Sequence, residues 1–150
     1  MAERMNGWQT AEQLLAHMFE VELGFMRSGS QDASGLARAF HPEVVVHEPA
    51  SLPYAGDWEG LEGVAALLRK MGEVWSDFRV EDMEAMRKGD TVFVSGTLHM
   101  KSRATGAEIA QPFAEVLHFK DDLLLDGTPF YYDTGEMVAA LSWLPAASPA

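Results

Sequence analysis

Residues 44–56, with the sequence VVVHEPASLPYAG, constrain the fold of this chain more than any other segment. Three consecutive valines are β-branched and favour a buried, pleated strand. Because strand side chains alternate between two faces, the first and third valines share a face with Glu48, whereas His47 points the other way. Pro49 cannot donate a backbone hydrogen bond, so strand pairing should end there, and residues 51–56 are typical of a loop.

Glu48 at the mouth of this strand has two interpretations. A carboxylate that shares a face with two valines is placed where acid–base chemistry could occur. A strand-end carboxylate in water is the structural alternative, and the segment alone does not decide between them.

The rest of the chain predicts one α+β domain over residues 1–150, with an ordered core of about 10–144. Thr10 and Gln13 have the capping-box spacing that begins a helix, and Asp133 with Glu136 has the pattern of a helix N-terminus. One curved antiparallel sheet with helices over its concave face would form a cone. The expected elements are helices at about 10–28, 32–40, 60–75 and after 133, and strands at 44–48, 78–85, 91–101, 108–120 and 123–132.

Composition limits the class of protein. Hydrophobic residues make up 47% and charged residues 23% of the 150 residues, which is usual for a globular domain. The net charge of −12 argues against nucleic acid and anionic membrane surfaces as partners. There is no cysteine, no membrane-spanning apolar run and no signal-peptide pattern, so we expect a cytoplasmic protein without disulfides. No histidine pair has a metal-ligand spacing, and we expect neither a metal nor a cofactor.

The later strands are apolar on both faces. Val92, Leu98 and Met100 would lie on one side of their strand and Phe93 on the other. A sheet that is apolar on both sides needs a second cover, which another subunit can supply. We therefore expect a homodimer.

The segment FHPEVVVHEPASLPYAGDWEGLEGVAALLRKM resembles the core of the nuclear transport factor 2-like superfamily, particularly its SnoaL-like and ketosteroid-isomerase-like members. The later pattern EVLHF followed by PFYYDTGEMVAAL is similar to the last strands and C-terminal helix of SnoaL-like (polyketide cyclase) proteins. The resemblance runs from about Leu14 to Leu144. It implies the cystatin-like cone, with a ligand cavity between sheet and helices.

Glu115 lies in the middle of a strand predicted to be central, on the same face as Phe113 and Leu117. Burial among apolar side chains should raise its pKa. An inward-facing edge charge or an ion pair with Arg103 are the alternatives. The resemblance to ketosteroid isomerases places Glu115 at their oxyanion-hole acid and Glu48 at their general base. Those isomerases also use a tyrosine of the first helix, and here that helix has none.

Further candidates for ligand binding are the aromatic and histidine side chains that could reach the cavity: His47, Tyr54, Trp58, His99, Phe113, Phe130 and Tyr132. An aromatic lining suits a flat, apolar small molecule. SnoaL-like cyclases are thought to use a histidine and an aspartate, which by resemblance keeps His118 and Asp133 as candidates beside His99. For Asp133, a helix N-cap is the structural interpretation.

These observations predict a cofactor-free enzyme of the isomerase, cyclase or dehydratase type. Glu48 and Glu115 would be its catalytic residues, acting on an apolar small molecule in the cone. The alternative is a module of the same fold without catalysis, which binds a small ligand or another protein.

Overall fold

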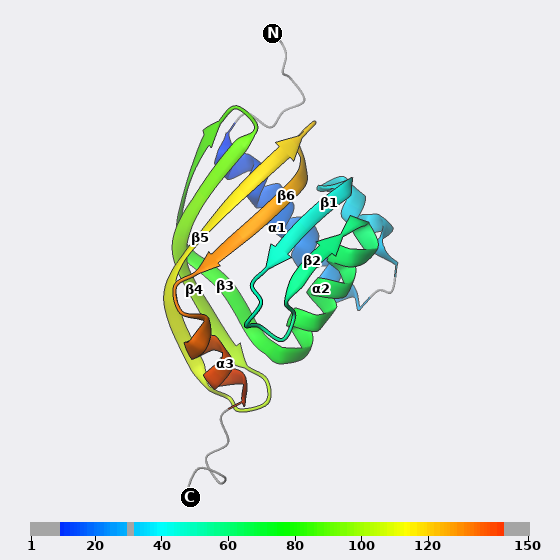
Figure 1. Ribbon diagram of the computed structural model, residues 1–150. Helices are drawn as coiled ribbons and strands as arrows, with labels where there is room; N and C mark the ends of the chain where they lie inside the picture. The colour runs from blue at the N-terminus through cyan, green and yellow to red at the C-terminus, as the bar shows by residue number, and fades with distance from the viewer. Residues whose placement is uncertain (1–9, 30–31, 143–150) are drawn as a thin grey trace, which may run out of the picture.

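The computed structural model describes residues 10–29 and 32–142 of the chain. A six-stranded sheet in the order β2-β1-β6-β5-β4-β3 curves around the helices (Figure 1). Neighbouring strands are antiparallel except β1 and β6, which are parallel. The elements are α1 (Ala11–Ser28), η2 (Ala33–Arg38), β1 (Phe40–Glu48), β2 (Gly56–Glu59), α2 (Gly60–Val74), β3 (Trp75–Lys88), β4 (Thr91–Ser102), β5 (Glu108–Lys120), β6 (Leu123–Tyr131) and α3 (Thr134–Ser142).

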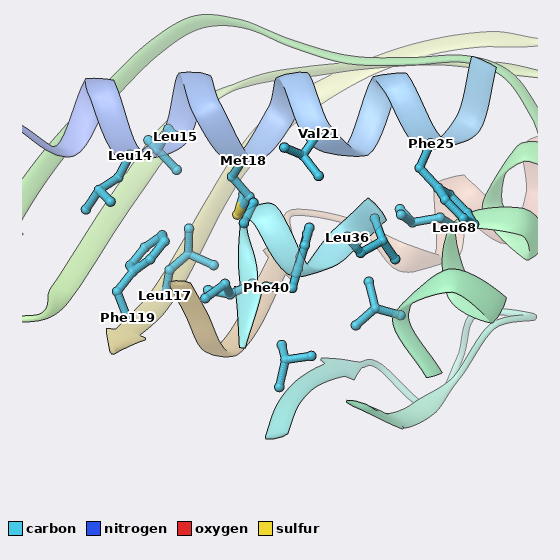
Figure 2. Packing of buried hydrophobic residues seen from close by; sticks show 14 of the residues in the cluster. Leu14, Leu15, Met18, Val21, Phe25, Leu36, Phe40, Leu68, Leu117 and Phe119 are labelled. Carbon is cyan, nitrogen blue, oxygen red and sulfur yellow. The ribbon is translucent and has the colours of Figure 1, made fainter. Parts of the chain in front are cut away.

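Helix α1 begins at the predicted capping box. The Thr10 hydroxyl accepts from the Gln13 backbone N–H at 3.0 Å, and the Gln13 side chain accepts from the Thr10 N–H at 3.1 Å. The helix ends at Gly29, whose φ of 64° is readily adopted only without a side chain. Figure 2 shows one face of α1, with Met18 and Phe25, directed toward the sheet and α2. The helix is held by this apolar face.

The N-terminal part of the sheet differs from the expectation in three respects. The segment expected to be helical at 32–40 forms the shorter 3₁₀ helix η2, and β1 begins at Phe40 rather than at residue 44. Pro42 is tolerated because it falls where the pairing of β1 with β6 is irregular. Residues 56–59, of which only Gly56 was assigned from the sequence, to a loop, form the edge strand β2. The predicted antiparallel sheet is thus interrupted by the parallel pair β1–β6.

A β-bulge bends the far side of the sheet. The register of β3 against β4 shifts between Glu81 and Glu84, and Asp82 takes a left-handed φ of 53°. Gly96 of β4 faces this bulge, where a Cβ would lie 2.6 Å from a methyl carbon of Val80 and 3.0 Å from the Glu81 carbonyl oxygen. A glycine is therefore required for the strands to approach each other here, and the sheet curves around the helices.

All three α-helices pack on the concave face of this open sheet, which confirms the predicted α+β cone (Figure 1). The core forms two clusters. In the view of Figure 1, one cluster joins α1, η2 and the upper part of the sheet. The other joins the end of α2, α3 and the lower parts of β4 and β5. No helix in the described part of the chain is long and apolar enough to cross a membrane. The predicted core limit at 144 lies outside the described residues.

Candidate functional site

A cavity of about 890 Å³ lies between the sheet and the two long helices. Its walls come from α1, α2, the end of β1, the first half of β3, and the concave faces of β5 and β6. Most of these side chains are apolar. Four glutamates also line the cavity: the exposed Glu73, and Glu22, Glu48 and Glu115, which are buried or partly buried. The volume is in the range that holds a small organic molecule.

Glu48 is placed by the end of β1 and held by β6. Its side chain is buried, and the Tyr131 hydroxyl donates a hydrogen bond to Glu48 Oε1 at 2.9 Å. Burial raises the pKa of Glu48, while the Tyr131 hydrogen bond lowers it and the nearby Glu115 raises it, with a result of about 8. A carboxyl that titrates near neutral pH can both take and return a proton.

Glu115 lies on the concave face of β5, in register with Val94 of β4 and Pro129 of β6. Burial raises its pKa to about 7, in the direction expected from the sequence. The surface that its side chain retains faces the cavity, because Glu115 lines it. The suggested ion pair with Arg103 does not form, since the Arg103 guanidinium donates to the carbonyl oxygens of Gly72 and Trp75.

Glu22 is the third carboxyl of the cavity and comes from α1. Burial, reinforced by the neighbouring Glu115 and Glu48 carboxyls, raises its pKa to about 8. Among residues 10–29 and 32–142, neither Glu22 nor Glu115 has a hydrogen-bond or ion-pair partner. Three carboxyls therefore share one apolar space in which their neutral forms are favoured.

The exposed side chains among the lining residues mark where the cavity opens. Arg27 ends α1, while Arg79 and Asp77 lie at the start of β3. Arg79 forms ion pairs with Asp77 and, at 2.8 Å, with Glu81. The rim is thus charged, with Arg79 paired to two carboxylates, whereas Glu22, Glu48 and Glu115 lie inside.

His47 lies on the opposite side of β1 from Glu48 and does not line the cavity. Its Nδ1 lies 2.7 Å from Asp57 of β2, and its Nε2 lies 2.8 Å from Asp126 of β6. Both ring nitrogens donate to carboxylates, and the Asp126 and Asp57 hydrogen bonds raise the pKa of His47. His47 was expected to contact the ligand, but it links β2, β1 and β6 on the side of β1 that faces away from the cavity.

Several other predicted ligand-binding residues lie elsewhere. Phe113 lines the cavity as expected. Tyr54 is buried and does not line the cavity, and its hydroxyl accepts a 2.8 Å hydrogen bond from Trp75. The Trp58 ring N–H donates to the Tyr54 carbonyl oxygen. Two candidates lie on the outer face of the sheet, His99 beside Glu81 and the exposed Phe130, and Tyr132 is an exposed residue just after β6.

The remaining candidates have structural contacts. His118 is exposed and its Nδ1 lies 3.1 Å from the Thr91 hydroxyl. Asp133 caps α3, because its carboxylate accepts from the Glu136 N–H at 3.1 Å. In the described part of the chain, no group of three or more histidine, aspartate and glutamate side chains could hold a metal ion.

Sequence reasoning missed Glu22 and Tyr131. Glu22 follows Met18 by four residues and precedes Phe25 by three, so a charge stands within the buried stripe of α1, and this was its signal. Tyr131 was overlooked because both faces of its strand are aromatic. The pairing of Phe113 with Tyr131 and of Ala114 with Phe130 settles which tyrosine faces inward.

A curved sheet with helices over its concave face, and a cavity with carboxyl groups between them, defines a cone-shaped α+β fold. A SnoaL-like domain model matches residues 21–126, and the chain belongs to this family. A search of curated proteins finds no match.

Solved structures share the fold at low sequence identity. An NTF2-like protein of unknown function from Burkholderia pseudomallei has a TM-score of 0.72 and 22% identity, over 89% of this chain and 98% of that one. A putative SnoaL-like polyketide cyclase from Jannaschia has a TM-score of 0.72 and 16% identity, over 97% and 100%. A ketosteroid-isomerase-like protein from Catenulispora acidiphila, in complex with trimethylamine, has a TM-score of 0.67 and 13% identity, over 91% and 97%.

Proposed function

We propose that this protein is an enzyme that performs carboxylate acid–base chemistry on an apolar small molecule in the cavity. The observation that carries the proposal is the presence of Glu48 and Glu115 in one largely apolar space, with Tyr131 bound to Glu48. Similarity to a putative polyketide cyclase and to a ketosteroid-isomerase-like protein supports a reaction of the isomerase, cyclase or dehydratase type.

In this proposal Glu48 is the general base. Its ionised carboxylate accepts a proton from the carbon next to a substrate carbonyl, and the electrons of the broken C–H bond form an enolate. Tyr131 donates to the carboxylate and fixes its direction. Glu48 then returns the proton to another carbon in an isomerisation. Otherwise the enolate carbon attacks a second carbonyl, whose oxygen takes the proton from Glu48, or a hydroxyl group next to the enolate carbon leaves as water with that proton.

Glu115 is the acid in this proposal. In its neutral form it donates a hydrogen bond to the oxygen on which negative charge develops, which stabilises the enolate more than the ketone. The chemistry requires Glu48 to be ionised while Glu115 keeps its proton. Because the pKa of Glu48 is the higher of the two, this is the less populated of the two forms in which the pair holds one proton. Because the pKa values of these coupled carboxyls lie at about 8 and 7, we expect a bell-shaped pH profile with its maximum between about pH 7 and 8.

The proposal can be tested before the natural substrate is known. Exchange of the methyl protons of 2-acetylnaphthalene in D₂O, followed by NMR, reports proton abstraction next to a carbonyl. The parent should accelerate this exchange, and Glu48→Gln should lower the catalysed rate by about 10²–10⁴. Binding should change far less, since the base acts mainly in the transition state.

Glu43→Gln is the matched control, because Glu43 is an exposed glutamate of the same strand. If Glu48→Gln keeps the exchange rate of the parent, Glu48 is not the base. A protein that binds a small ligand without turnover then becomes the better description. Native mass spectrometry of the purified protein would identify a ligand that it carries.

We also propose that the protein acts as a homodimer, in which the outer face of the sheet is covered by a second copy. That face carries Met86, Phe93 and Phe130, which are 72%, 44% and 55% exposed. None of the described helices covers it. The cytoplasmic location stays a prediction from the sequence.

A further inference from the structure

We propose that Glu22 is a second hydrogen-bond donor to the ligand, acting from the helix wall of the cavity while Glu115 acts from the sheet wall. The ligand it implies is an apolar molecule with a carbonyl oxygen that accepts two hydrogen bonds. This inference rests on the proposed function, because it assigns a further residue to the same site.

The position of Glu22 follows from the geometry of α1. Glu22 is one helical turn beyond Met18, so the two side chains share the face that is turned to the sheet. Figure 2 shows Met18 directed toward Leu117 of β5. Leu117 is two residues from Glu115 and shares its face of the strand, and both line the cavity with Glu22. The carboxyls of Glu22 and Glu115 therefore approach one space from two walls.

A carboxyl in this position needs an explanation. Glu22 is partly buried in the cavity wall and has no hydrogen-bond or ion-pair partner in the described part of the chain. A buried polar group without a partner costs stability, and a ligand that supplies the partner removes this cost. The neighbouring Glu115 and Glu48 carboxyls favour the neutral form of Glu22, but within the described residues neither is hydrogen-bonded to it.

The chemistry of the partner follows from the donor count. A neutral carboxylic acid offers one O–H donor, so Glu22 and Glu115 together offer two. A carbonyl oxygen has two lone pairs and can accept both hydrogen bonds. As negative charge develops on that oxygen, both bonds strengthen. Glu48 remains free to act as the base, held by Tyr131.

The test compares 2-acetylnaphthalene with 2-isopropenylnaphthalene, which has nearly the same shape but a CH₂ group in place of the oxygen. The ratio of their dissociation constants, here called the ketone preference, measures how much the hydrogen bonds to the ketone oxygen contribute to binding. Glu22→Leu should reduce the ketone preference about fivefold and leave affinity for the hydrocarbon nearly unchanged. The bound ketone's carbonyl stretch should move to higher wavenumber, since one donor is lost. Glu20→Leu, at an exposed position of the same helix, should change neither quantity.

A pH series with the isosteric variant Glu22→Gln gives a second measurement that does not depend on the leucine variant. In the parent, the ketone preference should fall as pH rises through about 7 and 8, because Glu115 and then Glu22 ionise and ionised carboxylates cannot donate. The glutamine amide keeps its N–H donors at all these pH values, so Glu22→Gln should lose less of the preference. An identical loss in both proteins overturns the inference.

The outcomes separate this inference from the proposed function. If Glu115→Leu abolishes the ketone preference while Glu22→Leu retains the preference and the carbonyl frequency of the parent, Glu22 is not a donor, and the proposed function stands. If the parent itself does not prefer the ketone, the acid role of Glu115 fails together with that of Glu22.

Discussion

At the scale of single residues, three carboxyls in one cavity affect folding and chemistry in opposite directions. Burial raises the pKa values of Glu22, Glu48 and Glu115 to about 7 or 8, from 4.5 in the unfolded chain. The same burial gives groups that exchange protons near neutral pH. The fold is therefore less stable in the pH range where these side chains are most useful as acids and bases.

We predict that Glu115→Gln stabilises the protein more at pH 8 than at pH 5. The raised folded-state pKa means that the unfolded chain holds fewer protons between about pH 4.5 and 7. The stability cost is absent below the unfolded pKa and complete above the folded one. Removing it should contribute about 1–3 kcal/mol at pH 8.

Urea unfolding of the parent and variant at the two pH values measures this difference. Glu108→Gln is a suitable control, since Glu108 is an exposed residue of the same strand. A ¹³C NMR titration that places the Glu115 carboxyl at or below its ordinary pKa would contradict the prediction.

The two sheet carboxyls were predictable because strand alternation is simple. Val44 and Val46 fix the phase of Glu48, and Phe113 and Leu117 fix that of Glu115. The orientation of the aromatic candidates was not predictable from the sequence. Phe130, Tyr131 and Tyr132 are consecutive, so either phase of the strand buries an aromatic ring. Only the pairing of β6 with β5 shows that Tyr131 faces the cavity.

At the scale of elements, His47 links the strand that carries Glu48 to both of its neighbours. Asp57 belongs to β2 and Asp126 to β6, so one imidazolium bridges three strands on the face opposite the cavity. Loss of this link should loosen β1, and through β1 the contact between Glu48 and Tyr131.

We predict that His47→Gln destabilises the protein more at pH 6 than at pH 9. The raised pKa of His47 in the folded state means that its contribution is complete below its ordinary pKa of 6.5 and is lost as pH rises through the folded value. Thermal unfolding at both pH values measures the change. His118→Gln is the control, because His118 is an exposed histidine that contacts Thr91. An equal loss at both pH values would mean that the ring, rather than its charge, stabilises the strands.

The order of elements was largely predictable from hydrophobic periodicity and caps. The expected strand at 108–120 matches β5, and the expected helix at 60–75 ends one residue late. The parallel pairing of β1 with β6 was not predictable, since it joins distant segments and depends on how the sheet closes over the helices. Strand β2 was missed because its four residues pair only with β1.

At the scale of the whole molecule, the outer face of the sheet is the part of the fold without a cover among the described elements. Phe93 pairs with Met86 on one side and with Val116 on the other, which makes a continuous apolar strip across β3, β4 and β5. Such a strip is typical of an interface between proteins.

We predict that Phe93→Glu converts a dimer into a monomer, because it places a charge in the centre of this strip. Sedimentation equilibrium at micromolar concentration should give twice the 16.5 kDa chain mass for the parent and the single chain mass for the variant. Ala37→Glu, at an exposed position of η2, should remain dimeric. A parent that sediments only as a 16.5 kDa species would refute the assembly.

The contact between Glu48 and Tyr131 spans 83 residues of chain, and the link from His47 to Asp126 spans 79. During synthesis, β1 therefore leaves the ribosome long before the strand that completes its surroundings. Until β6 is synthesised, β1 can pair only with the short strand β2, and the valines of β1 are not yet buried by their neighbouring strand. A nascent chain that stops before Leu123 would contain most of the sheet and both long helices but no assembled site. The last strand to be made is thus the one that joins β1 and β2 to β5 and brings Tyr131 to Glu48.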